Sequence, residues 1–101
     1  MIYHVVTDDE WQSAVAQGFY ESPSLAIEGF IHTCTMEQLK GVLERYYKNK
    51  TNLLLLYIDE TKLDAELKYE LSPSIQEHFP HIYGQLNIDA VIKVTPIEQA
   101  L

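Results

Sequence analysis

LLLLYI, at residues 53–58, is the longest apolar run in the chain, and the other predicted elements are best understood around it. A run without polar interruption is typical of a strand covered on both faces, because a strand with one solvated face alternates apolar and polar residues. The run is far too short to cross a bilayer. We therefore predict a central strand here and no association with a membrane.

Two helices are predicted before this run, and each begins with a capping box. Thr7 and Glu10, like Thr35 and Gln38, place a hydroxyl three residues before Glu or Gln, a pattern that opens a helix. The first helix follows a strand at residues 2–6, IYHVV, and ends near Gly18, a residue suited to the end of a helix. The second helix carries an apolar stripe of Leu39, Val42, Leu43 and Tyr46.

Gly41 stands inside this second helix, where it costs ~1 kcal/mol relative to alanine. We take it as a sign of close packing against another element.

The remaining segments complete an α+β pattern. Residues 19–28 contain Pro23 and two serines and are predicted to form a loop, and residues 59–66 a turn with a short helix. Further strands are expected at residues 29–33, 67–71 and 88–94. The helices thus come from the N-terminal half, and we expect one domain over residues 1–101.

FPHIYG, at residues 79–84, combines an imidazole, a phenol and a glycine with a proline that fixes the local backbone. This mixture is unfavourable for a regular strand or helix. We predict that it forms a loop and one wall of a pocket.

Composition and charge limit the classes of partner. Hydrophobic residues make up 47% and charged residues 22% of the chain, which is typical of a globular protein. The formal net charge is −8, which repels phosphate backbones and disfavours nucleic acid as a partner. The single cysteine, Cys34, excludes an internal disulfide, and the chain enters IYHVV without a basic leader. We therefore expect a cytoplasmic protein.

The candidate site residues lie close to the histidines. His4, His32 and His81 are candidates, although a lone histidine in a strand is more often structural. Four histidines without HExxH or CxxC spacing do not predict a metal site. Cys34 is more typical of a small buried side chain than of a nucleophile, because no positive charge in the sequence accompanies it.

Three further candidates come from the same segments. Glu70 lies on the polar face of the strand at residues 67–71 and is the carboxylate we select, against the alternative of a solvated surface glutamate. Tyr83 can stack on a flat ring or donate from its hydroxyl, or belong to the core. Thr33 and Thr35 can bind phosphate or cap the second helix, and capping is the better explanation for Thr35.

The chain resembles a small bacterial family known as domain of unknown function 952. The resemblance runs nearly from end to end, through IYH, SLAIEGFIHT at residues 24–33, YID at residues 57–59 and FPHIYG, together with residues between them. Several motifs in the same order make it specific. The resemblance implies a fold similar to the catalytic domain of ADP-ribosyltransferases, a compact split β-sheet with two main helices and a cleft for NAD.

In that superfamily a first-strand histidine, matched here by His4, contacts the adenosine ribose of NAD. The resemblance further implies that His32, His81 or Tyr83 lies beside the nicotinamide. Those enzymes carry a catalytic glutamate near their last strands, where this chain has Gln85 and Asp89. Glu70 could substitute from another strand, because stabilising an oxocarbenium-like charge requires only a well-placed carboxylate.

Two classes of function therefore stay open. In the first, the chain binds NAD or an ADP-ribose-like nucleotide, with Glu70 and His81 as catalytic candidates and His4, His32, Thr33 and Tyr83 as ligand-binding ones. It would act as an ADP-ribosyl transferase or bind without transfer. In the second, the chain is a non-enzymatic module whose acidic surface binds a basic protein. Metal-dependent or hydrolytic chemistry is a further alternative, and the oligomeric state is not predicted.

Overall fold

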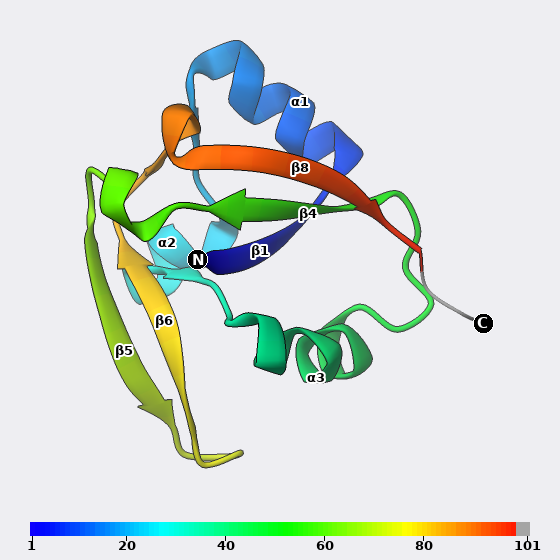
Figure 1. Ribbon diagram of the computed structural model, residues 1–101, viewed down its shortest axis with the longest axis vertical. Coiled ribbons are helices and arrows are strands. Elements are labelled where there is room, and N and C mark those ends of the chain that lie inside the picture. The colour runs from blue at the N-terminus through cyan, green and yellow to red at the C-terminus, as the bar shows by residue number, and fades with distance from the viewer. Residues whose placement is uncertain (99–101) are drawn as a thin grey trace.

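The computed structural model describes residues 1–98 (Figure 1). Its α-helices are α1 (Asp8–Gln17), α2 (Pro23–Glu28) and α3 (Met36–Tyr46). Its strands are β1 (Ile2–Thr7), β2 (Phe19–Tyr20), β3 (Ile31–His32), β4 (Leu53–Ile58), β5 (Glu66–Ser72), β6 (Glu77–Tyr83), β7 (Leu86–Asn87) and β8 (Val91–Ile97). Two short 3₁₀ turns, η1 (Glu60–Lys62) and η2 (Ile88–Ala90), complete the elements.

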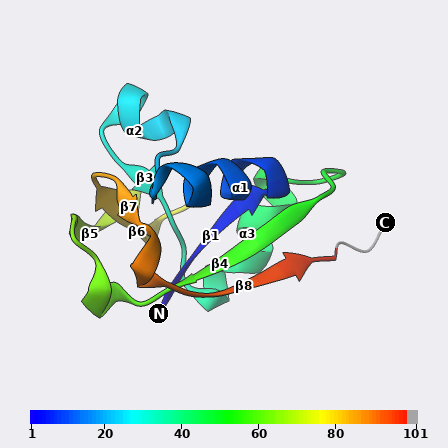
Figure 2. The same ribbon diagram turned by 90° about the horizontal axis from the view of Figure 1, so that it is seen from above.

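The predicted central strand is confirmed. β4 lies between β1 and β8 in an antiparallel sheet, and α1 and α3 lie on opposite sides of it (Figures 1 and 2). Leu56 and Ile58 face the core cluster that includes Ala14 of α1. Leu53 and Leu55 face the cluster against which α3 packs. Because both faces are covered, every position of the run except Tyr57 is apolar.

A second sheet, in the order β3-β6-β5, stands beside the first, and β2 pairs separately with β7. The two larger sheets are joined where Tyr3 and Cys34 exchange backbone hydrogen bonds of 2.8 and 2.9 Å. The hairpin of β5 and β6 extends away from the central sheet on the side of α3 (Figure 1). The strands are therefore divided among several antiparallel sheets, and the predicted α+β class is confirmed.

The prediction of a loop at residues 79–84 is wrong, because most of FPHIYG belongs to β6, the middle strand of the second sheet. Pro80 is tolerated there because its carbonyl accepts from the backbone and hydroxyl of Thr33, just beyond the last ladder pair of β6 with β3. A strand residue directs its N–H and carbonyl to the same side. The nitrogen of Pro80 therefore faces the same side as its carbonyl, where β3 has already ended. Its lack of an N–H removes no ladder bond.

The prediction of a loop at residues 19–28 is also wrong, since β2 and α2 lie there. α2 begins at Pro23, a favourable first residue of a helix, and ends before Gly29, which has a φ of 90°. The expected two main helices are therefore joined by a third, short one. The strand predicted at residues 29–33 is shorter, and the one predicted at residues 88–94 begins later, after η2.

Both predicted capping boxes are present. The Thr7 hydroxyl accepts from the backbone of Glu10 at 3.1 Å, and Glu10 accepts from the backbone of Thr7 at 2.7 Å. At α3, the side chain of Gln38 accepts from the backbone of Thr35 at 3.0 Å. Among residues 1–98, no helix has the length and apolar character needed to cross a membrane.

Candidate functional site

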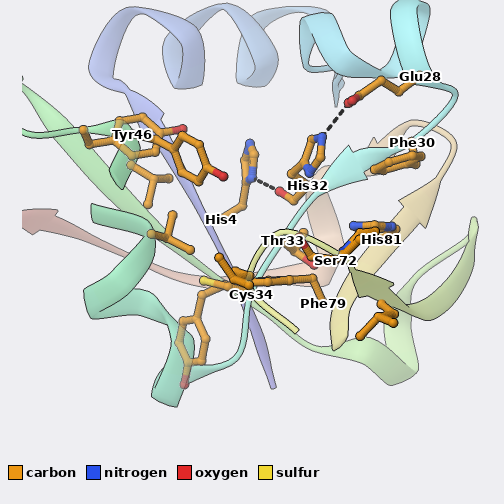
Figure 3. Close-up of a pocket in the computed structure, with 17 residues that line it drawn as sticks. His4, Glu28, Phe30, His32, Thr33, Cys34, Tyr46, Ser72, Phe79 and His81 are labelled. Atoms are coloured by element: carbon orange, nitrogen blue, oxygen red, sulfur yellow. Dashed lines mark hydrogen bonds and ion pairs between the residues drawn. The ribbon is translucent and has the colours of Figure 1, made fainter. Parts of the chain in front are cut away.

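A cleft of about 660 Å³ opens between α3, the β5–β6 hairpin and the segment from α2 to β3 (Figure 3). One end, which we call the polar end, is lined by Glu28, Phe30, His32 and His81. The other end, which we call the apolar end, includes Val5, Val42 and Phe79 of one apolar cluster, together with Tyr46 and Ile75. Leu71 also lines the cleft, but it lies between Glu70 and Ser72 and directs its side chain to the other face of the hairpin. His4, Thr33 and Cys34 lie on the floor between the walls, with Tyr3, Tyr47, Ser72 and Pro73 also lining the cleft. The volume is in the range typical of small-molecule sites.

His4 is held by two hydrogen bonds and is 8% exposed. Its Nδ1 lies 2.5 Å from the carbonyl oxygen of His32 and its Nε2 lies 2.9 Å from the hydroxyl of Tyr20. Because a carbonyl can only accept, Nδ1 carries the proton, and Nε2 accepts from Tyr20. Burial lowers the pKa of His4 to about 4, which keeps the ring neutral in this arrangement. A ligand at His4 would therefore meet a ring whose nitrogens are both already bonded.

His81 and Glu70 form a hydrogen-bonded pair at the opposite wall. Nδ1 of His81 lies 2.8 Å from Oε1 of Glu70, and the same oxygen accepts from the hydroxyl of Tyr83. These bonds, first that from Tyr83 and then that from His81, lower the pKa of Glu70. The bond to the carboxylate raises the pKa of Tyr83. The carboxylate therefore holds the proton of a neutral His81 on Nδ1 and leaves Nε2 with the lone pair.

The register of β5 and β6 explains why these groups meet. Lys68 is opposite His81 and Glu70 is opposite Phe79 in the antiparallel ladder. Opposite residues share a face, as do alternate residues along one strand. Glu70, His81 and Tyr83 are therefore on the same face of the hairpin.

Phe30 contacts the other aromatic rings near the polar end of the cleft. Its ring stacks on that of His81 with centroids 3.9 Å apart and planes at 19°, and meets His32 edge-on at 4.8 Å. Tyr83 lies 5.4 Å from it. His32 in turn contacts His81 at 5.3 Å, as expected for directly paired residues of β3 and β6. The rings thus form one aromatic cluster at the end of the cleft.

His32 is the accessible histidine of this cluster, with 55% of its side chain exposed. Its Nε2 donates to Oε2 of Glu28 at 2.5 Å, as Figure 3 shows. Glu28 is the last residue of α2, and the turn at Gly29 brings it back over β3. Ser24 supports this turn by donating to the carbonyl of Phe30 at 2.8 Å.

The structure therefore brings His4, His32, Thr33 and His81 to one cleft, although they come from three separate segments. Glu70 and Tyr83 do not line the cleft; Glu70 bonds to His81, and Tyr83 contacts Phe30. The hydroxyl of Thr33 donates to the carbonyl of Pro80 at 2.6 Å, so its donor is already used. The roles assigned to these six residues remain predictions.

Sequence reasoning did not select Phe30, Glu28 or Tyr20. A signal for Phe30 was present, because it alternates with His32 in EGFIHT and alternate residues of an extended segment share a face. Glu28 precedes His32 by four residues, but the pairing depends on the turn at Gly29. Tyr20 reaches His4 only through the pairing of β2 with β7, which nothing local in the sequence indicates.

Two further observations concern the thiol on the floor and the arrangement of possible metal ligands. Cys34 is buried, and burial raises the pKa of its thiol to about 11, so a reactive thiolate is disfavoured. Within residues 1–98, no group of three or more histidine, cysteine or acidic side chains is arranged to hold a metal ion.

The fold and the site together define a small α+β domain with an aromatic, histidine-containing cleft. The chain belongs to the family described as protein of unknown function (DUF952), whose model matches residues 5–94. That match includes every predicted site residue except His4.

Solved structures agree with this assignment. The crystal structure of protein CC0527 from Caulobacter crescentus is 31% identical, with a TM-score of 0.89 over 98% of this chain and 87% of that chain. The solution NMR structure of CC0527 is also 31% identical, with a TM-score of 0.84 over 98% of this chain and 85% of that chain. Among curated proteins none matches the chain.

Proposed function

We propose that this domain binds an NAD- or ADP-ribose-like nucleotide in the cleft, with the resemblance to ADP-ribosyltransferases extending to its fold and ligand. The observation that carries the proposal is the convergence of His4, His32 and His81, from three separate segments, on one cleft of about 660 Å³. If each histidine served only its own part of the core, no common cavity would be expected.

The polar end suits the flat ring of such a ligand. Phe30 and the histidines around it offer aromatic faces and edges, which stack well on a base or a nicotinamide. The hydrogen-bonding atoms of His32 and Glu28 lie beside them and can contact ribose hydroxyls. We therefore assign the aromatic ring and the ribose of the ligand to the polar end of the cleft.

The diphosphate is assigned to the open side of the cleft. The described lining residues include no lysine or arginine, and Glu28 is the carboxylate among them. A phosphate held deep in the cleft would meet no fixed positive charge. Binding is therefore expected to depend on the ring and the ribose more than on the phosphates.

If the domain also transfers ADP-ribose, His81 is the group suited to act as the base. Its Nδ1 is held by Glu70, and its Nε2 is left to take a proton from an acceptor. Glu70, which does not line the cleft, is then a positioning residue that sets the tautomer of the imidazole. This role differs from that of a carboxylate which contacts the ribose directly.

Binding can be tested by titrating NAD and ADP-ribose into the labelled protein and following histidine and amide resonances. We expect shifts at His4, His32 and His81, and a weaker complex with Phe30→Leu. His78→Gln provides a matched control, because His78 lies on the same strand as His81 but outside the cleft. An unchanged spectrum at millimolar ligand would exclude the proposal.

Transfer is tested separately, by nicotinamide release from NAD. His81→Gln should reduce the rate by roughly 10²–10⁴-fold if His81 is the base. Glu70→Gln should reduce it and also change its pH profile, whereas His78→Gln should do neither. Binding without release would leave a nucleotide-binding domain. Salt-sensitive capture of a basic protein that survives His81→Gln, without nucleotide binding, would support the interaction module instead.

A further inference from the structure

The apolar end of the cleft is not used by the proposed nucleotide contacts. It lies between α3, which contributes Val42 and Tyr46, and the hairpin, which contributes Ile75 and Phe79. Val5 of β1 lies on its floor and is buried. These side chains come from three elements that are distant in the sequence, and they form two walls and a floor.

The shape and polarity of this end favour a small apolar ligand. Water in contact with Val5, Val42 and Phe79 finds few hydrogen-bond partners, so its displacement by an apolar group is favourable. Tyr46 remains 64% exposed although it lines the cleft. Large exposed apolar side chains around a concave surface are typical of a binding site.

The charge of the surroundings restricts which apolar ligand is accepted. The described residues that line the cleft include Glu28 but no lysine or arginine, and the chain carries a net charge of −8. A carboxylate on the ligand would lose hydration without gaining a cation. A hydroxyl or an ammonium group can instead approach the imidazoles of His81 and His32 or the carboxylate of Glu28.

We propose that the apolar end binds a small apolar alcohol or amine, with its polar group directed toward His81. Binding of this molecule does not require the nucleotide. Its role as the second substrate, the acceptor of ADP-ribose, rests on the proposed function.

In that role the reaction balances without a further co-reactant. The hydroxyl oxygen forms a bond to C1′ of the nicotinamide ribose while the bond from C1′ to the pyridinium nitrogen breaks. Nicotinamide leaves as a neutral molecule with the electron pair of that bond. The hydroxyl proton passes to Nε2 of His81, whose Nδ1 proton is held by Glu70.

Three ligands of similar size but different charge test the binding step: phenethyl alcohol, phenethylamine and phenylacetate. Each is titrated into the nucleotide-free protein while methyl resonances of Val5, Val42 and Ile75 are followed. We expect the alcohol and the amine to shift these methyls and phenylacetate to bind about tenfold more weakly or worse. Equal binding of all three, or no shift with the alcohol and the amine, would overturn the proposal.

A variant that adds a positive charge to the cleft provides a second test. Tyr46 lines the cleft from α3 and is 64% exposed, so Tyr46→Lys should fold normally and should shift the preference toward phenylacetate. Ile27→Lys is the matched control, because Ile27 is exposed on α2 and does not line the cleft. If Tyr46→Lys leaves the order of affinities as in the wild type, the ligand does not occupy the apolar end.

The outcomes separate this inference from the proposed function. NAD binding with no response to the three ligands would remove the apolar site and leave the nucleotide site. Binding of the alcohol with no NAD binding would retain the apolar ligand and remove its role as an acceptor.

Discussion

His4 illustrates how a residue selected for chemistry can also be a structural element. It is the one buried histidine among residues 1–98. Its two hydrogen bonds connect β1 to the backbone of β3 and to the side chain of Tyr20 on β2. Protonation of the ring would place a proton on Nε2. That nitrogen would then have to donate toward the hydroxyl of Tyr20, which now donates to it, in a buried site. The lowered pKa of His4 expresses this cost, to which burial contributes most.

We predict that the stability of the domain falls as the pH is lowered through this range. The pKa of His4 is about 4 in the folded state and about 6.5 in the unfolded state, so the unfolded chain binds the proton more tightly. The contribution of His4 is present above pH 6.5 and is lost between pH 6.5 and 4, by about 2 kcal/mol from pH 7 to 5. Denaturant unfolding at several pH values measures it.

His4→Gln is the matching variant, because it retains a donor and an acceptor but does not titrate. It should be less stable at pH 7 and should show a flatter dependence on pH between 7 and 5. An NMR titration of the wild type gives the pKa of His4 directly. A midpoint near 6.5 would contradict the argument from burial.

At the scale of elements, the sequence predicted those whose signals are local. The apolar run at residues 53–58 and the capping boxes at Thr7 and Thr35 each specify an element without reference to the rest of the chain. β6 was missed because Pro80 disfavours a strand unless its N–H side is unpaired, and only the end of β3 determines that. The same limit applies to the site, because the sequence selects His81 but does not indicate which side chains contact it.

Gly41 in α3 provides a prediction about an element. Close packing against another element does not explain it, because a Cβ there would meet the flexible guanidinium of Arg45, at 2.8 Å, on the same helix. That side chain can move at little cost. Gly41→Ala should therefore stabilise the domain by up to ~1 kcal/mol, the difference in helix propensity, as measured by thermal or denaturant unfolding.

Gly18→Ala is the contrasting variant. Gly18 ends α1 with a φ of 95°, a conformation that costs alanine energy although space is available. It should destabilise the domain by about 1 kcal/mol. The interpretation of Gly41 would be wrong if both variants were destabilising to the same degree.

At the scale of the whole molecule, β4 connects β1 and β8 as the middle strand of the central sheet. Leu56 is fully buried and is paired with His4 on one side and Val94 on the other. Leu56→Ala should cost about 2–5 kcal/mol, a large part of the 5–15 kcal/mol typical of a domain. Ile92→Ala, on the half-exposed part of β8, should change the stability by no more than about 0.5 kcal/mol. Denaturant midpoints at equal slope compare the two.

The cleft connects ligand binding to the stability of the whole molecule, because its lining extends from Tyr3 on β1 to His81 on β6. Unfolding of either sheet removes part of the site, so a bound ligand should stabilise the domain as one unit. At ten times its dissociation constant, NAD or ADP-ribose should add about 1.4 kcal/mol. For a domain of this size, that raises the melting temperature by about 6–11 °C. The increase in melting temperature should be lost or reduced in His81→Gln and retained in His78→Gln. If millimolar ligand leaves the melting temperature of the wild type unchanged, a nucleotide site in this cleft is contradicted.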